Sequence, residues 1–159
     1  IFVYSEPDRG TTFKLYFPVT EEKLEEEKAE RTLTMPHGSE TILVVDDEET
    51  IRRLVKDTLT PLGYCILEAR RGSEALQIAK GTAPPVDLLV TDVIMQGMNG
   101  KELRDRFSEE LPKIRAILMS GYTGTIIAQH GIAVPGTDFI QKPFSPSQLA
   151  ELVRHVLDR

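Results

Sequence analysis

The sequence predicts an α/β protein with a doubly wound sheet of five parallel strands in the order 2-1-3-4-5, preceded by a β-hairpin extension. From Thr41 onward, short runs rich in β-branched residues alternate with stretches of helical periodicity, which is typical of parallel βαβ units. Right-handed crossovers with short loops leave few ways to wind five such units, and this order is the most common of them.

The predicted strands share an apolar, β-branched composition and are expected at residues 41–45, 64–68, 86–91, 114–119 and 137–140. Five helices are expected to complete the units. The first ends at Gly63, and its buried face is predicted to comprise Ile51, Leu54, Val55, Leu59 and Leu62.

The last helix has the clearest start signal. Ser145 and Gln148 have the spacing of a capping box, and Pro146 falls at the first helical position. The segment 125–130, between the fourth and fifth strands, is short and β-branched, and a glycine flanks it on each side. We expect it to be the least rigid element.

Composition limits the function classes. The net charge is −6, and residues 1–40 hold 9 acids against 5 bases, so we expect no nucleic-acid partner. No apolar run approaches the roughly 18 residues of a membrane span, so we expect no membrane contact by this chain. The single cysteine, Cys65, lies in a short apolar run. It is predicted to be a buried thiol, which fits a cytoplasmic location.

The first forty residues differ from the rest. Residues 1–20 alternate apolar and polar side chains around a Pro-Asp-Arg-Gly turn, which predicts a β-hairpin. Residues 21–40 are predicted to be a charged linker, because residues 21–31 contain six glutamates and too few apolar side chains to bury a helix face. Residues 41–159 then form the α/β domain.

Several reactive side chains follow the predicted strands. Asp46 and Asp47 end the first strand, Asp92 the third and Ser120 the fourth, while Lys142 comes shortly after the fifth. In the order 2-1-3-4-5 the first and third strands are neighbours, so the three carboxylates are expected to meet at the topological switch point. Carboxylates, a hydroxyl and an ammonium group at one sheet edge suit phosphoryl transfer to a carboxylate.

This set of residues resembles the receiver domain of two-component response regulators, a flavodoxin-like fold, over residues 41–158. Asp92 lies 45 residues after Asp47, Ser120 28 further on, and Lys142-Pro143 another 22. The resemblance implies that Asp92 accepts a phosphoryl group from a phosphohistidine, that Lys142 and Ser120 contact that group, and that the domain then switches conformation. It also implies a receiver that promotes its own phosphorylation and dephosphorylation, which leaves open whether to class it as an enzyme.

The same resemblance implies one cofactor, Mg²⁺. Asp47 and Asp92 would bind it directly, Asp46 through a water, and Ile94 through its backbone carbonyl. Phe139 matches the aromatic residue whose rotamer accompanies the switch, and Lys142-Pro143 matches a cis peptide bond. Family members commonly carry proline where this chain has Gln96, which puts the rigidity of that loop in doubt.

A branched apolar side chain and a bulky aromatic ring are predicted to control how fast the phosphoryl group is hydrolysed. Ile94 lies two residues after Asp92, and Tyr122 lies two residues after Ser120. Neither side chain orients a water well, so we predict a long-lived phosphoryl state.

The N-terminal hairpin resembles the closing hairpin of a histidine-kinase ATP-binding domain. Ser5-Glu6, Gly10-Thr11, Phe13 and Pro18 carry this resemblance, although Asp8 stands where that family usually has glycine. It implies that the chain is the C-terminal piece of a hybrid histidine kinase. The phosphodonor is then expected to lie elsewhere, on a histidine kinase or a histidine phosphotransfer domain, and a weak homodimer is a further option.

Two other readings remain open from the residues. An aspartyl-phosphate phosphatase of the haloacid-dehalogenase kind also uses an aspartate nucleophile and Mg²⁺, but it places Asp-x-Asp after its first strand, where this chain has Asp46-Asp47-Glu48. A receiver-like domain that acts without phosphorylation would not require the complete set of site residues found here.

Overall fold

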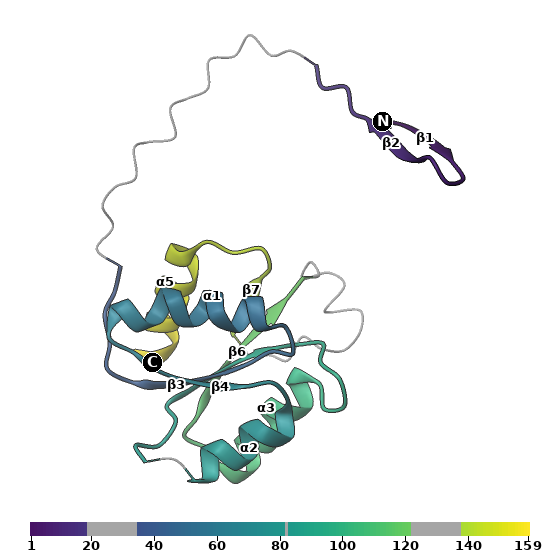
Figure 1. Ribbon diagram of the computed structural model, residues 1–159. Coiled ribbons are helices and arrows are strands. Elements are labelled where there is room, and N and C mark those ends of the chain that lie inside the picture. The colour runs from purple at the N-terminus through teal and green to yellow at the C-terminus, as the bar shows by residue number, and fades with distance from the viewer. Residues whose placement is uncertain (19–34, 82, 122–137) are drawn as a thin grey trace. The chain divides into compact units, whose positions relative to one another are not determined.

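The computed structural model describes residues 1–18, 35–81, 83–121 and 138–159. The chain divides into two units, Ile1–Leu33 and Thr34–Arg159. The first contains a two-stranded sheet and the second contains the five-stranded sheet and its helices (Figure 1). No helix among the described residues is both long enough and apolar enough to cross a bilayer.

The N-terminal unit has the predicted hairpin. β1 (Phe2–Glu6) and β2 (Gly10–Lys14) pair antiparallel, with Val3 opposite Phe13. Two residues at the turn have positive φ: Asp8 at 61° and Gly10 at 91°. Within this unit the large apolar side chains of both strands are exposed, as expected for a sheet of only two strands.

The large sheet is parallel throughout. Its strands are ordered β4-β3-β5-β6-β7, which is the predicted order 2-1-3-4-5 in strands numbered from Thr41. Their bounds are β3 (Thr41–Val45), β4 (Cys65–Ala69), β5 (Leu88–Asp92), β6 (Arg115–Ser120) and β7 (Asp138–Gln141). β3 and β5 are completely buried, because the sheet is covered on both faces.

The described helices form two layers (Figure 1). They are α1 (Glu49–Leu59), followed by the 3₁₀ turn η1 (Thr60–Leu62), then α2 (Gly72–Gly81), α3 (Gly100–Glu110) and α5 (Pro146–Leu157). α1 and α5 pack against one face of the sheet, and α2 and α3 against the other. The expected helix around residues 125–130 lies outside the described residues.

The end signals read from the sequence are confirmed, but one buried position is wrong. Gly63 ends the first helical segment with φ at 96°, and Ser145 and Gln148 form the capping box of α5. Leu54, however, is 40% exposed. It lies about 100° around the helix from Val55, outside the buried stripe, and Arg52 is buried in that stripe instead.

The prediction of a buried thiol at Cys65 is also wrong, because the side chain is exposed. β4 is an edge strand and Cys65 is its first residue, so fewer elements cover it than cover β3 or β5. An apolar neighbourhood in the sequence does not distinguish the end of an edge strand from the middle of a central one.

Residues just before Thr41 contact the α/β domain. The Gly38 amide donates to the Leu62 carbonyl at 3.0 Å, and Met35 packs against the core beside α1 and α5. Arg154 of α5 forms an ion pair with Glu40 at 2.7 Å, and its hydrogen bond lowers the pKa of the Glu40 carboxyl. The contacts of the domain therefore begin within the segment predicted to be linker.

Candidate functional site

The predicted site residues lie at the carboxyl ends of neighbouring strands. Asp46 follows β3, Asp92 ends β5, Ser120 ends β6, and Lys142 follows β7. Since all five strands are parallel, these ends share one edge of the sheet, and β3 and β5 are adjacent there. This is the topological switch point at which doubly wound sheets bind ligands.

Three carboxylates converge at this edge. Oxygens of Asp46, Asp47 and Asp92 all lie within 4.8 Å of one another. Asp46 and Asp92 are buried and Asp47 is exposed, so the cluster opens to solvent on one side. Hard oxygen ligands with room for water are what Mg²⁺ prefers, and the donor set therefore fits that ion.

Asp46 is fixed in place by hydrogen bonds to both of its carboxylate oxygens. Oδ1 accepts a hydrogen bond from the Glu48 amide at 2.9 Å, and Oδ2 accepts one from Lys142 Nζ at 2.7 Å. The Asp46 carbonyl oxygen accepts a further bond from Arg52 Nη1 at 2.8 Å. The direction of this acid is therefore set before any ligand binds.

Lys142 bridges two of the acids. Its Nζ is 2.7 Å from Asp46 Oδ2 and 2.8 Å from Asp92 Oδ1. Burial by itself lowers the pKa of Lys142, but hydrogen bonds to Asp46 and Asp92 together with their negative charges outweigh it and raise the pKa. Burial raises the pKa of Asp92 despite the opposing effect of Lys142. The ammonium group is thus firmly charged beside a carboxyl that resists ionisation.

The backbone around Asp92 is also restrained. The Ile94 amide donates to Asp92 Oδ2 at 3.1 Å, and the buried Thr91 hydroxyl donates to the Asp92 carbonyl at 3.1 Å. Gly100, the first residue of α3, donates its amide to the Val93 carbonyl at 3.0 Å. A Cβ at position 100 would collide with the Asp92 carbonyl oxygen, so the close approach of α3 requires glycine here.

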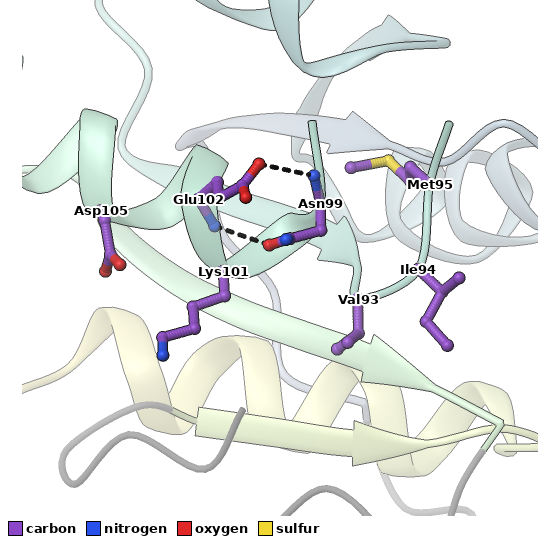
Figure 2. Close-up of a pocket in the computed structure, with 7 residues that line it drawn as sticks. All are labelled: Val93, Ile94, Met95, Asn99, Lys101, Glu102 and Asp105. Atoms are coloured by element: carbon purple, nitrogen blue, oxygen red, sulfur yellow. Dashed lines mark hydrogen bonds between the residues drawn. The ribbon is translucent and has the colours of Figure 1, made fainter. Parts of the chain in front are cut away.

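Figure 2 shows how α3 begins at Asn99 and Glu102. The Asn99 side chain accepts from the Glu102 amide at 2.8 Å, and the Glu102 carboxylate accepts from the Asn99 amide at 3.3 Å, which completes a capping box. An open cleft of about 500 Å³ adjoins it, and Ile94 is part of its lining. Ile94 is 57% exposed, so its side chain is in contact with solvent next to Asp92.

The remaining predicted residues have mixed outcomes. Ser120 is buried at the end of β6, and its carbonyl accepts the Lys142 amide at 2.7 Å. The Lys142-Pro143 bond is cis, as predicted. Phe139 is half-buried in β7 opposite Leu118, and nothing in the structure tests its role as a switch. Tyr122 lies outside the described residues.

Sequence reasoning missed Arg52 and Gly100. Arg52 falls three and seven residues before Val55 and Leu59, and this helical spacing places it on the buried stripe of α1. A charged residue on that stripe was a signal that its guanidinium has buried partners. Gly100 carried a weaker signal, because glycine in the first turn of a helix also occurs without a packing reason.

Comparisons with known proteins agree with this geometry. The family model described as response regulator receiver domain matches residues 42–154. The sensor kinase CckA of Brucella abortus is 36% identical over 99% of this chain, and this chain spans 18% of its length. The transcriptional regulatory protein ResD of Bacillus subtilis is 39% identical over 79% of this chain, which spans 51% of that regulator.

Solved structures give the same result. The receiver domain of the hybrid histidine kinase CckA is 36% identical, with a TM-score of 0.62 over 74% of this chain and 98% of that one. The chemotaxis response regulator CheY4 of Vibrio cholerae is 30% identical, with a TM-score of 0.66 over 75% of this chain and 99% of that one. The chain belongs to the family of response regulator receiver domains and carries a receiver domain of two-component signalling.

Proposed function

We propose that Asp92 is the phosphoacceptor of this receiver and takes its phosphoryl group from a phosphohistidine. A carboxylate oxygen of Asp92 forms the new O–P bond as the P–N bond of the donor breaks, and the imidazole leaves. The observation that carries the proposal is the position of Asp92 at the switch point, 2.8 Å from the Lys142 ammonium and within a cluster of acids.

The residues around Asp92 have separate roles in this proposal. Lys142 supplies positive charge to the phosphoryl oxygens, and the Ser120 hydroxyl hydrogen-bonds the group once it is attached. Asp46, Asp47 and Asp92, together with the Ile94 carbonyl, would hold Mg²⁺. When bound, the ion neutralises charge on the transferring group. Ser120 and Phe139 then report the modification to the rest of the domain.

The decisive experiment compares wild type with Asp92→Asn. Each protein is incubated with acetyl phosphate and Mg²⁺, and its intact mass is measured. Wild type gains one phosphoryl group and the variant gains none. Asp105→Asn, which changes a half-buried carboxylate on α3 outside the acid cluster, is the matched control and labels as wild type does. Chelation of divalent cations abolishes labelling of wild type. Labelling of Asp46 or Asp47 in Asp92→Asn contradicts the assignment.

The hairpin supports a second part of the proposal, that this chain is a portion of a hybrid histidine kinase. The alignment with the sensor kinase CckA covers 99% of this chain, so it includes residues before the receiver match at residue 42. In this proposal residues 1–20 are the last hairpin of the kinase's ATP-binding domain, and the receiver exchanges its phosphoryl group with a histidine kinase or histidine phosphotransfer domain. The cytoplasmic location expected from the sequence stays a prediction.

The two alternatives gain no support. The family match and the related solved structures are receivers and response regulators, and the aspartates after the first strand of the sheet are adjacent, not spaced as Asp-x-Asp. A receiver that acts without phosphorylation would be indicated by failure of wild type to label in the experiment above.

A further inference from the structure

We propose that Arg52 is a positioning residue that sets the direction of the Asp47 carboxylate and thereby the affinity for Mg²⁺. This inference rests on the cation site proposed above. Arg52 is only 4% exposed, although it is charged and lies on a helix at the surface of the domain. Its Nη1 donates to the Asp46 carbonyl oxygen at 2.8 Å. A buried guanidinium is expensive to desolvate, so its partners indicate what it does.

The hydrogen bond acts on the link between the two acids. The Asp46 carbonyl and the Asp47 amide belong to one planar peptide unit, so fixing the carbonyl oxygen fixes that plane and the direction in which the chain enters Asp47. Asp46 has other restraints, because its carboxylate contacts the Glu48 amide and Lys142. The Asp47 carboxylate is exposed and makes no hydrogen bond or ion pair within the described part of the chain. Its direction therefore depends on the backbone that Arg52 fixes.

Arg52 is itself positioned from the neighbouring strand. Glu68 of β4 places Oε2 3.9 Å from Arg52 Nε, and its other oxygen is 2.6 Å from Lys56 Nζ. The guanidinium therefore lies between an acid on the edge strand and the turn that carries the metal-binding pair. Outer partners of this kind orient metal ligands and change metal affinity when they are removed.

Two possible roles of Arg52, as a nearby positive charge and as a positioning residue, predict opposite changes in Mg²⁺ affinity when it is replaced. If Arg52 acted only as a positive charge near the site, removing it would strengthen the binding of a cation. If it positions Asp47, removing it weakens binding although every ligand remains present. Arg53 is the matched control, because it is adjacent on the same helix, 79% exposed at its side chain, and paired only with Asp57 among the described residues.

The experiment titrates Mg²⁺ into the ¹⁵N-labelled full chain and follows backbone amide shifts by NMR. Arg52→Met is expected to weaken Mg²⁺ binding roughly tenfold, the lower end for loss of such a partner. The Mg²⁺ affinity of Arg53→Met is expected to match that of wild type. Arg52→Lys keeps the charge but has fewer hydrogen-bond donors, and its affinity is expected to lie between those of wild type and Arg52→Met. Thermal unfolding of each variant shows that the titrations are made on folded protein.

The outcomes separate the two proposals. If wild type does not bind Mg²⁺, or if Asp47→Asn binds as tightly as wild type, the proposed cation site fails. If wild type binds and Arg52→Met binds equally well or more tightly, the positioning role of Arg52 is overturned and the cation site stands. If Arg52→Met does not fold, Arg52→Lys decides: it keeps the positive charge, so charge alone predicts the affinity of wild type, and unchanged affinity overturns the proposal.

Discussion

Lys142 Nζ lies 2.8 Å from Asp92 Oδ1, yet the pKa of Asp92 is raised and not lowered. Burial of the carboxyl is the largest cause, and the charge of Asp46 acts in the same direction. The ammonium group offsets only part of these effects. In the absence of metal, ionised Asp92 therefore costs folding free energy, and the cluster is arranged for a cation that must be supplied from solution.

The first prediction is that Asp92→Asn stabilises the metal-free protein at pH 7. A carboxyl with a raised folded-state pKa contributes most when protonated, below its unfolded pKa, and the contribution is lost as pH rises through the folded pKa. The variant should be more stable than wild type at pH 7 and similar near pH 3, below the usual range of an aspartate at about 3.9. Urea unfolding in the presence of a chelator measures the free energy of unfolding at both pH values.

Asp105→Asn serves as the control for this comparison, since Asp105 is half-buried, pairs with Arg104 and lies outside the acid cluster. It should leave the pH dependence of unfolding unchanged. A metal-free Asp92→Asn protein that is less stable than wild type at pH 7 would show that the Lys142 contact outweighs burial.

The second prediction concerns Gly100. An added Cβ would collide with the Asp92 carbonyl oxygen and approach the Val93 backbone, neither of which can move without shifting β5. Gly100→Ala should reduce the free energy of unfolding by about 1–3 kcal/mol, the usual cost of overpacking, and should slow phosphorylation of Asp92. Gly81→Ala is the matched control, because nothing lies within 4 Å of a Cβ there. A neutral Gly100→Ala would show that α3 can withdraw from Asp92.

The third prediction locates the start of the receiver by truncation. Removing residues 1–33 should leave thermal stability and phosphorylation unchanged, because they form a separate unit. Removing residues 1–38 should cost about 2 kcal/mol, since it deletes the packing of Met35 and the bond from Gly38 to the Leu62 carbonyl. Chemical denaturation of the two truncated proteins measures the difference. Equal stability of the two truncated proteins would place the start of the domain at Thr41, as predicted from the sequence. A loss of stability on removing residues 1–33 would contradict the division into two units.

Most of the fold was predictable because its signals are local or follow from chain topology. Gly63 and the Ser145 capping box mark helix ends through backbone chemistry that operates within a few residues. The strand order follows from handedness and short loops. Once that order is set, Asp46 and Asp92 must meet, whatever the side chains between them are.

The errors share one physical reason, which is that burial depends on what packs against a position. Leu54 is apolar but points away from the sheet, while Arg52 is charged but enters the stripe that contacts it. Cys65 has apolar neighbours in sequence but begins an edge strand. The contact of Gly100 with the Asp92 carbonyl depends on how closely α3 approaches β5, which no local pattern encodes.

The last prediction is the lifetime of the phosphoryl group. The Ile94 amide donates to Asp92 Oδ2 at 3.1 Å, so the backbone position of residue 94 is fixed independently of its side chain. That side chain is 57% exposed next to Asp92 and offers an approaching water no hydrogen bond. Ile94→Asn supplies one, which should speed hydrolysis about two- to tenfold, the factor given by roughly 0.5–1.5 kcal/mol for one hydrogen bond. Intact mass is followed after the phosphodonor is removed, with Ile94→Leu as the apolar control. Decay of Ile94→Asn that is as slow as wild type would show that water approaches the phosphorus from a side that Ile94 does not cover.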